Sequence, residues 1–266
     1  AADRLNLRGR SRRFPQNPPP IKSTEVCPPC FKTMKRPPLV NNEIYHIILR
    51  GVGDTEIFKD ESDHYRGIFS IYEFNTTKPI EIRLQREKRQ TIKQHGGQTS
   101  DTRNCLVDIL SFCFMPNHIH LLVKQLKDNG ITRFMKKVGS GYATYFNKKY
   151  NRKGHLFQNR FQAVRIKDDD QLKIVFAYIH TNPVSLTEPN WKENGIKDLN
   201  KVIKFLESYN WSSYLDYIGG KAFPSVTNRN LIIGMLNGVD GCKEFINDIW
   251  IKYKGRIKEF SDRFLE

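Results

Sequence analysis

The order of apolar segments predicts an α+β fold, a sandwich with a largely antiparallel sheet. The β-branched run 44–49 predicts a strand, and 107–114 and 119–123 predict two more strands joined by a short turn. Apolar residues recur at helical spacing in 60–74, and 131–150 predicts a second helix. The resulting order, strand, helix, strand, strand, helix, favours helices packed against an antiparallel sheet.

A further helix is predicted over residues 168–182. Three acids, Asp168 to Asp170, suit the positive N-terminal end of a helix. The helix should end near Asn182, because Pro183 follows and the residue before a proline disfavours the helical conformation. Beyond this point, tryptophans, tyrosines and an amphipathic stretch predict a helical C-terminal extension over residues 187–266.

Composition excludes several classes of protein. The 266 residues are 38% hydrophobic and 27% charged, and no apolar run approaches the roughly 20 residues that span a bilayer. Five cysteines are too few, and too odd in number, for a disulfide-stabilised secreted fold. No apolar stretch follows the charges of residues 1–13, so we expect no secretory signal and a cytoplasmic protein.

Positive charge is concentrated in two segments. The chain carries 44 basic and 28 acidic residues, a formal net charge of +16. Residues 1–37 hold nine basic and two acidic residues, and residues 129–167 hold ten basic residues and no acid. Charge clustered in this way favours a polyanionic partner, most simply nucleic acid, over a solvated face with a basic tail.

Two segments are predicted to lie outside the folded core. Residues 1–38 hold eight of the thirteen prolines beside the basic cluster, which predicts a flexible arm. Cys27 and Cys30 in this arm could be half of a zinc site or a redox pair. No second Cys or His pair has matching spacing, so a chance pair is favoured. Residues 76–104 are polar and predict a surface insertion.

Two histidines lie at strand spacing in a segment with a strong strand pattern. Side chains alternate between the faces of a strand, so His118 and His120 point the same way. Two imidazoles about 7 Å apart along one face can bind one divalent metal if another element supplies a third ligand. The alternative, slightly favoured for this motif taken alone, is a pair of surface or hydrogen-bonded histidines.

Tyr178 and Asn182 are four residues apart on the predicted helix 168–182, so they share one helical face. Tyr178 could be a core aromatic with its hydroxyl at the edge. Alternatively, it is a nucleophile beside a metal, with Asn182 as an oxygen ligand. A phenol has a pKa near 10, so it needs a nearby metal or base to react at neutral pH.

Four segments, taken in order, resemble one enzyme family. FMPNHIHLLVK is similar to the HUH motif of the one-tyrosine, single-strand DNA transposases. FQNRFQAVRIKDDDQLKIVFAYIHTNPV resembles their REP-associated tyrosine transposase branch, in the transposase IS200-like group. YHIILRG with IFKDESDHYRGIF, and YNWSSYLDYIGG, resemble further segments of that branch. The resemblance covers about residues 39–220.

The resemblance implies a fold and a set of site residues. It implies a ferredoxin-like sandwich with four or five strands over a catalytic domain at 39–186. His118 and His120 would be the HUH metal ligands, Tyr178 the nucleophile and Asn182 the third ligand. The insertion 76–104 is longer than the family's usual link, and the basic arm is not part of the shared core.

The resemblance also implies a reaction and its partners. The enzyme would cleave single-stranded or hairpin DNA with Mg²⁺ or Mn²⁺, and would form a 5′-phosphotyrosine without ATP. Two cuts per transposition imply a homodimer or two sequential events. No membrane and no small-molecule substrate are expected, and the cytoplasmic protein would associate with the nucleoid when bound to DNA.

Basic residues are expected to contact the DNA, most of them in the 129–167 block. Arg50 or Arg160 could supply base-specific contacts. Of the aromatic residues interleaved in the block, several must be core and one or two could stack on bases. The predicted DNA-binding residues are Arg50, Arg133, Lys136, Lys137, Lys148, Lys149, Arg152, Lys153, Arg160, Arg165 and Lys167.

Two alternatives to a tyrosine transposase are a non-catalytic or domesticated nucleic-acid-binding protein of the same fold and a metal-dependent nuclease that uses water. Retention of both histidines together with Tyr178 argues against the first. His46, His155 and His180 are predicted to lie outside the ligand set, with His46 packed in or at the edge of the first strand.

Overall fold

The computed structural model describes residues 36–80 and 103–252 of the chain. The predicted arm 1–38, with Cys27 and Cys30, lies almost entirely outside these residues, as do most of the predicted insertion and the end of the extension. The residues from Met34 onward belong to one compact unit, and the following description concerns that unit alone.

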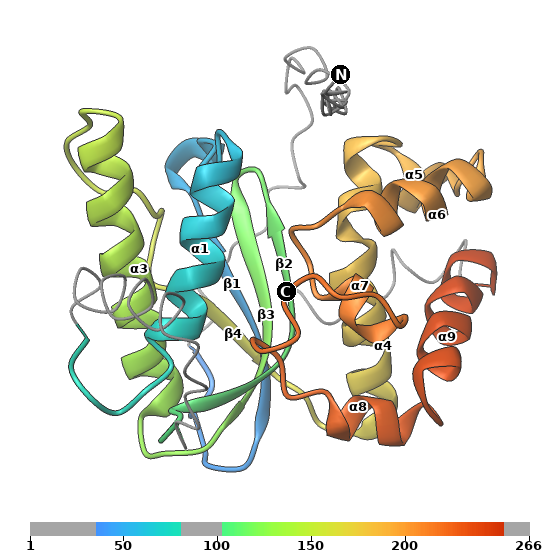
Figure 1. The fold of residues 1–266 in the computed structure, drawn as a ribbon, viewed down its shortest axis with the longest axis horizontal. Helices are drawn as coiled ribbons and strands as arrows, with labels where there is room; N and C mark the ends of the chain where they lie inside the picture. Colours follow the sequence, from blue (N-terminus) through green and yellow to red (C-terminus); the bar gives the residue numbers. More distant parts are fainter. Residues whose placement is uncertain (1–35, 81–102, 253–266) are drawn as a thin grey trace, which may run out of the picture. The chain divides into compact units, whose positions relative to one another are not determined.

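A four-stranded sheet organises the fold (Figure 1). Its strands are β1 (Ile44–Arg50), β2 (Val107–Met115), β3 (His118–Gln125) and β4 (Gln162–Arg165). The strand order is β2-β3-β1-β4, and every neighbouring pair is antiparallel. Helices α1 (Glu61–Glu73) and α3 (Gly130–Lys149) complete a β-α-β-β-α-β order, that of a ferredoxin-like fold. The predicted α+β class is confirmed.

Strand alternation separates two hydrophobic cores, one on each face of the sheet. Ile119, Leu121 and Val123 of β3 are buried in the core that includes the apolar residues of α1 and α3. Leu122 belongs to the other core, together with the apolar residues of helix α4 (Asp169–Thr181). His118 and His120 have the parity of Leu122, so they lie on the α4 face.

Helix α4 begins and ends where the sequence predicts. The Asp168 carboxylate caps it by accepting a hydrogen bond from Gln171 N at 2.7 Å. The helix ends at Thr181 with Asn182 as its C-cap, directly before Pro183. Buried residues on α4, such as Phe176 and Ile179, hold it against the sheet.

The described part of the C-terminal extension, up to residue 252, is helical, as predicted. Its helices are α5 (Trp191–Asn194), α6 (Leu199–Ser208), α7 (Tyr214–Tyr217), α8 (Asn230–Met235) and α9 (Val239–Lys252). Their buried residues share the core of the α4 face. Ser212 also forms an isolated β-bridge with Cys113 of β2. The extension therefore contacts the sheet through backbone hydrogen bonds as well as through side-chain packing. None of the helices among the described residues has the length and hydropathy needed to cross a bilayer.

Candidate active site

Strand β3 brings its two histidines together on the α4 face. The ring nitrogens His118 Nε2 and His120 Nε2 are 2.9 Å apart. Across the sheet, His118 is paired with Arg50 of β1 and with Met115 of β2. His120 is buried, and His118 is only partly exposed.

A third histidine joins them from β1. His46 is 1% exposed, and its Nε2 lies 2.9 Å from Nδ1 of His120. The two rings are stacked, with centroids 5.1 Å apart and an angle of 18° between their planes. The expectation that His46 packs in the first strand is confirmed, and its contact with His120 is a feature that the sequence analysis missed.

Tyr178 of α4 lies edge-on against these imidazoles. Its ring centroid is 5.7 Å from that of His120, at 89°, and 6.1 Å from that of His46, at 75°. Tyr178 is half-buried, so its ring packs against the core while the side chain keeps access to solvent. The structure therefore brings together a phenol and a histidine pair that lie about sixty residues apart in the sequence.

Two cations flank this group. Lys192 of α5 donates a hydrogen bond to the Tyr178 hydroxyl at 3.5 Å, and its Nζ lies 4.8 Å from the centre of the ring. Arg50, at the end of β1, pairs with Asp54 at 2.9 Å. Burial, and then the positive charges of Arg50 and Lys192, hold the pKa of His118 well below its usual value. The pKa of His120 is lowered by burial first, and then by the neighbouring His118 and His46 and the cations Lys192 and Arg50.

The donor chemistry of the histidine pair fits a divalent cation. Neutral imidazoles carry a lone pair, and two nitrogens about 2.1 Å from one cation at a right angle are about 3 Å apart. Asn117 Oδ1 lies 2.6 Å from Nδ1 of His118 and fixes that ring, as the outer partner of a metal-binding histidine does. Within residues 36–80 and 103–252, no group of three or more His, Cys, Asp or Glu side chains could hold a metal. A complete site therefore needs ligands of another kind besides the two histidines.

Asn182 is placed one helical turn from Tyr178. Its Nδ2 donates to the Tyr178 carbonyl oxygen at 3.0 Å, and the residue is 6% exposed. Among the described residues, no hydrogen bond uses its Oδ1. Within the described part of the chain, Asn182 makes no hydrogen bond with His118 or His120, so its predicted role as a ligand stays a prediction.

The basic block divides into paired and unpaired cations. The Lys137 ammonium donates to the Thr76 and Lys78 carbonyls, and Arg165 pairs with Glu43 at 2.7 Å. Arg133 and Arg152 also donate to backbone carbonyls. Within the described part of the chain, no hydrogen bond or ion pair uses the charged groups of Lys136, Lys148, Lys153, Arg160 and Lys167.

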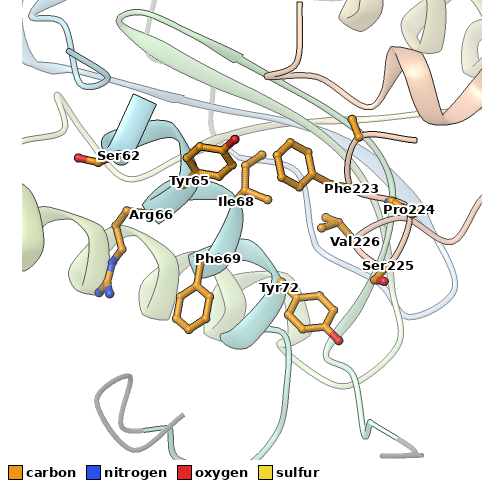
Figure 2. A pocket seen from close by; sticks show the side chains of 11 residues that line it. Ser62, Tyr65, Arg66, Ile68, Phe69, Tyr72, Phe223, Pro224, Ser225 and Val226 are labelled. Atoms are coloured by element: carbon orange, nitrogen blue, oxygen red, sulfur yellow. The ribbon is translucent and has the colours of Figure 1, made fainter. Parts of the chain in front are cut away.

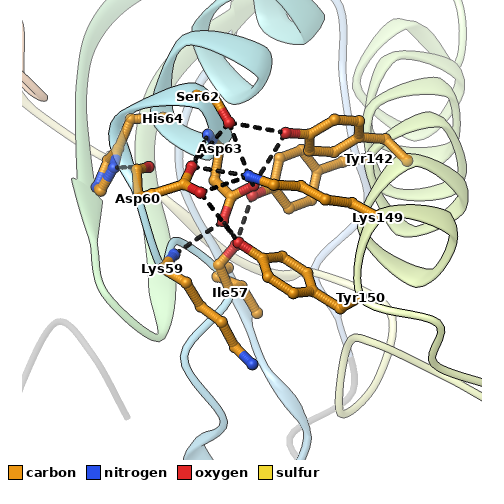
Figure 3. Close-up of polar contacts among 10 residues, drawn as sticks. Ile57, Lys59, Asp60, Ser62, Asp63, His64, Tyr142, Lys149 and Tyr150 are labelled. Carbon is orange, nitrogen blue, oxygen red and sulfur yellow. Dashed lines mark hydrogen bonds and ion pairs between the residues drawn. The ribbon is translucent and has the colours of Figure 1, made fainter.

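Lys149 belongs to a polar cluster that joins α1 to α3 (Figure 3). We call Asp60, Asp63, Tyr145, Lys149 and Tyr150 the α1–α3 cluster. The Lys149 ammonium lies 2.6 Å from an Asp60 oxygen and 2.7 Å from an Asp63 oxygen. The hydroxyls of Tyr145 and Tyr150 donate to Asp63 at 3.0 and 2.7 Å. The two tyrosine hydroxyls and the Lys149 ammonium therefore already have partners within the cluster.

The other aromatic residues of the block are mainly core. Tyr142, Phe146 and Phe161 are buried among the residues of the α1 and α3 core. Phe157 is partly buried against the same core. Their packing accounts for most of the aromatic spacing in the block, as the sequence analysis expected for several of them.

A pocket of about 640 Å³ lies elsewhere, between α1 and residues 222–226 (Figure 2). Tyr65, Phe69, Tyr72 and Phe223 line it. Helix α1 packs on the sheet face opposite α4, so this pocket is separate from Tyr178 and the histidines. It contains none of the residues predicted to act in catalysis.

Two predictions about the remaining histidines agree with the structure, and two contacts were missed. His155 is exposed, and His180 is buried and bonded to Ser213 Oγ at 2.8 Å, away from the histidine pair. What the sequence did not indicate is the contact of His46 with His120 and that of Lys192 with Tyr178. The alternation of β1 gives the face of His46, but no local pattern indicates that Lys192 reaches Tyr178.

Comparison with known proteins agrees with the family resemblance. The sequence model of the family described as "Transposase IS200 like" matches residues 40–182. Of the solved structures, a REP-associated tyrosine transposase bound to a REP hairpin is 12% identical, with a TM-score of 0.45. That match covers 74% of this chain and 91% of the other.

A tRNA(His) guanylyltransferase from Saccharomyces cerevisiae is 13% identical, with a TM-score of 0.28, and the match covers 65% of this chain and 75% of the other. No curated protein sequence matched. The family match spans more than half of the chain and includes both histidines of β3 and Tyr178. The chain therefore belongs to the IS200-like transposase family, whose members bind and recombine DNA.

Proposed function

We propose that this transposase cuts and rejoins single-stranded DNA with Tyr178 as its nucleophile, and that His118 and His120 hold Mg²⁺ or Mn²⁺. The observation that carries the proposal is the contact of the Tyr178 ring with His120, 5.7 Å between centroids, beside the His118 nitrogen. Membership of a transposase family supplies the substrate class, since transposases act on DNA.

In the proposed reaction, the Tyr178 oxygen attacks the phosphorus of a phosphodiester. A new oxygen–phosphorus bond forms to Tyr178, and the bond from phosphorus to the 3′-oxygen breaks. The phenol proton leaves to water, and the released 3′-oxygen takes up a proton. The product is a 5′-phosphotyrosine and a free 3′-hydroxyl. A second 3′-hydroxyl can reverse the step and join strands, so no ATP is needed.

The charges around Tyr178 suit this reaction. The Lys192 ammonium contacts the phenol oxygen, so it stabilises negative charge there both during attack and when Tyr178 leaves on rejoining. Arg50 lies opposite His118 and adds positive charge beside the proposed phosphate position. A bound divalent ion would polarise a non-bridging oxygen of the scissile phosphate. The imidazoles of His118 and His120 stay neutral and offer lone pairs.

Asn182 is our candidate for a further ligand. Its amide nitrogen is held by the Tyr178 carbonyl, which leaves the oxygen as the available donor atom. An amide oxygen beside two imidazoles is a ligand set that a divalent cation accepts. Water and the phosphate itself would complete the coordination.

DNA binding is proposed to use the unpaired cations first. Arg160 lies two residues after Gln158, whose backbone nitrogen donates to the Arg50 carbonyl at 2.9 Å, and we assign Arg160 to the phosphate contact nearest the site. Lys136 and Lys148 lie on α3, across the sheet from Tyr178, and we assign them long-range attraction rather than contact with the scissile phosphate. The motif resemblance favours a hairpin substrate with a single-stranded flank. Two copies of the chain would supply the two tyrosines for two cuts.

The experiment that tests the proposal compares Tyr178→Phe with the wild type on a labelled single-stranded hairpin oligonucleotide. On a denaturing gel, the wild type should give a covalent protein–DNA adduct with Mn²⁺, and Tyr178→Phe should give none while it still binds the oligonucleotide. Tyr65→Phe is the matched control, since Tyr65 is 55% exposed on α1 and away from the site.

Three results would overturn the proposal. An adduct that survives in Tyr178→Phe would assign the nucleophile to another residue. Cleavage that releases a free 5′-phosphate, unaffected by Tyr178→Phe, would indicate a nuclease that uses water. Binding with neither adduct nor cleavage in the wild type would indicate a non-catalytic DNA-binding protein.

A further inference from the structure

The site contains three imidazoles, and the proposed reaction gives a role to His118 and His120 but none to His46. It lies 2.9 Å from His120 and is almost completely buried. Its cross-strand neighbours are apolar, Leu122 on β3 and Val164 on β4. A ring buried among apolar neighbours favours the neutral form, which carries one proton on one of its two nitrogens.

Hydrogen-bond accounting assigns that proton when no cation is bound. Asn117 Oδ1 accepts from His118 Nδ1, so His118 Nε2 carries a lone pair. The 2.9 Å contact between the two Nε2 atoms then requires the His120 proton on Nε2. His120 Nδ1 is therefore an acceptor, and His46 donates to it from Nε2. This leaves His46 Nδ1 as a lone pair, consistent with its having no hydrogen-bond partner among the described residues.

A cation held by both Nε2 atoms requires the opposite arrangement at His120. The His120 proton must then sit on Nδ1, and this N–H needs an acceptor in a buried place. The atom in position is His46 Nε2, which becomes an acceptor when the His46 proton moves to Nδ1. The Nδ1–H group then has no acceptor among the described residues, so metal binding must offset the cost of this unpaired donor. An imidazole can donate or accept at the same nitrogen, and an apolar side chain at this position could do neither.

We propose that His46 is a positioning residue of the metal site, which acts through Nε2 to hold the ring plane and the tautomer of His120. This inference rests on the proposed function, because it gives His46 a purpose only if His120 is a ligand. The stacked geometry supports it, since a ring 5.1 Å away at 18° fixes the plane in which His120 directs its nitrogens. Asn117 Oδ1 holds the His118 ring in the same way, through the hydrogen bond from His118 Nδ1.

The test measures Mn²⁺ affinity of the full chain by electron paramagnetic resonance, without DNA. His46→Phe keeps a ring to stack on His120 but removes the nitrogen, and it should weaken Mn²⁺ binding by about 10- to 100-fold. His46→Gln keeps an amide oxygen that can accept from His120 Nδ1, and it should restore most of the affinity. His120→Ala, which removes the ligand itself, sets the value for complete loss.

The outcomes separate this inference from the proposed function. If His120→Ala binds Mn²⁺ as the wild type does, the metal site itself is wrong. If His120→Ala loses binding but His46→Phe does not, His46 has no positioning role. If His46→Phe and His46→Gln lose affinity equally at unchanged melting temperature, packing alone explains the effect and the inference fails.

A measurement on the wild type keeps the inference testable even where a variant does not fold. Nitrogen-15 spectra of the histidine side chains distinguish the two neutral tautomers. The metal-free chain should show the His120 proton on Nε2, and a diamagnetic ion such as Zn²⁺ should move it to Nδ1 with a matching change at His46. A His46 tautomer that does not change with the metal would overturn the coupling.

Discussion

Two polar clusters on opposite faces of the sheet differ in how completely they are paired. In the α1–α3 cluster, the Lys149 ammonium meets two carboxylates, and the two tyrosine hydroxyls meet Asp63 (Figure 3). On the α4 face, Arg50 pairs with Asp54, but the described residues give Tyr178 and Lys192 no carboxylate partner, and His46 Nδ1 has no hydrogen-bond partner among them. A cluster that satisfies its own charges stabilises a fold, whereas a cationic group without a counter-charge is suited to an anionic ligand.

The same difference distinguishes two kinds of cation in the basic block 129–167, those paired within the fold and those available to a ligand. Lys149 is indistinguishable from Lys148 in the sequence, yet its charge is neutralised by Asp60 and Asp63. Conversely, Lys192 lies outside the block and contacts the hydroxyl of Tyr178, the proposed nucleophile. Charge density in the sequence therefore predicts the kind of partner, and pairing in the structure decides which charges are available to it.

The largest expected effect is loss of cleavage on removal of divalent ions. EDTA should abolish adduct formation, because two neutral imidazoles offer no charge to offset that of the phosphate. Added Mn²⁺ or Mg²⁺ should restore the wild type but not His118→Ala. The melting temperature in EDTA should stay close to that in buffer, since the fold does not depend on the site. Full cleavage in EDTA would contradict a role for metal.

Breaking the α1–α3 cluster should reduce stability without affecting the chemistry. Lys149→Met removes the counter-charge of the buried Asp63 carboxylate, which keeps its hydrogen bonds from Tyr145 and Tyr150, and should lower the free energy of unfolding by about 1.5–3 kcal/mol. Lys148→Met, at an exposed neighbouring position, should change it by less than about 0.5 kcal/mol. Urea denaturation measures both. Equal effects would show that the cluster does not stabilise the protein.

The same variant has a defined pH dependence. Burial alone would raise the pKa of Asp63, but hydrogen bonds from Lys149 and Tyr150 lower it in the wild type. A lowered carboxyl pKa stabilises the folded state above the unfolded pKa, near 4, and this contribution disappears as pH falls through the folded pKa. The stability difference between the wild type and Lys149→Met should therefore be largest near pH 7 and should shrink below about pH 4. A difference that is constant with pH would contradict the ion pair.

An effect of similar size is expected from Lys192 on the α4 face. Lys192→Met removes a charged hydrogen bond to the Tyr178 oxygen, worth about 1.5–3 kcal/mol, so single-turnover cleavage should slow by about 10- to 100-fold. Lys192→Arg should recover part of the rate. Lys204→Met, on the exposed side of α6, is the control and should cleave normally. Unchanged cleavage in Lys192→Met would exclude contact with the reacting oxygen.

The smallest expected effect is on the salt dependence of DNA binding, which reports which face of the sheet the DNA contacts. If Arg160 contacts a phosphate and Lys148 does not, Arg160→Gln should reduce the slope of log affinity against log salt by about 0.7 for single-stranded DNA. Lys148→Gln should leave the slope nearly unchanged. Fluorescence anisotropy at several salt concentrations measures it, and the reverse result would place the DNA over α3.

Elements with strong local signals could be predicted from the sequence, and those that depend on strand pairing could not. The caps Asp168 and Asn182 fix the ends of α4 locally, and the two-residue period places His118 and His120 on one face. Strand β4 has only four residues, too few to show a pattern. The His46–His120 contact depends on the register of β1 against β3, which joins residues more than seventy positions apart.

The nucleophile can be identified directly from the adduct. Trypsin should release residues 174–192 as one peptide, because no Lys or Arg lies between Lys173 and Lys192, and Tyr178 is its single tyrosine. After reaction of the wild type with a single-stranded hairpin and Mn²⁺, followed by nuclease and trypsin digestion, mass spectrometry should find this peptide with a nucleotide phosphate on Tyr178. A phosphate on any other residue, or cleaved DNA with no modified peptide, would contradict the account.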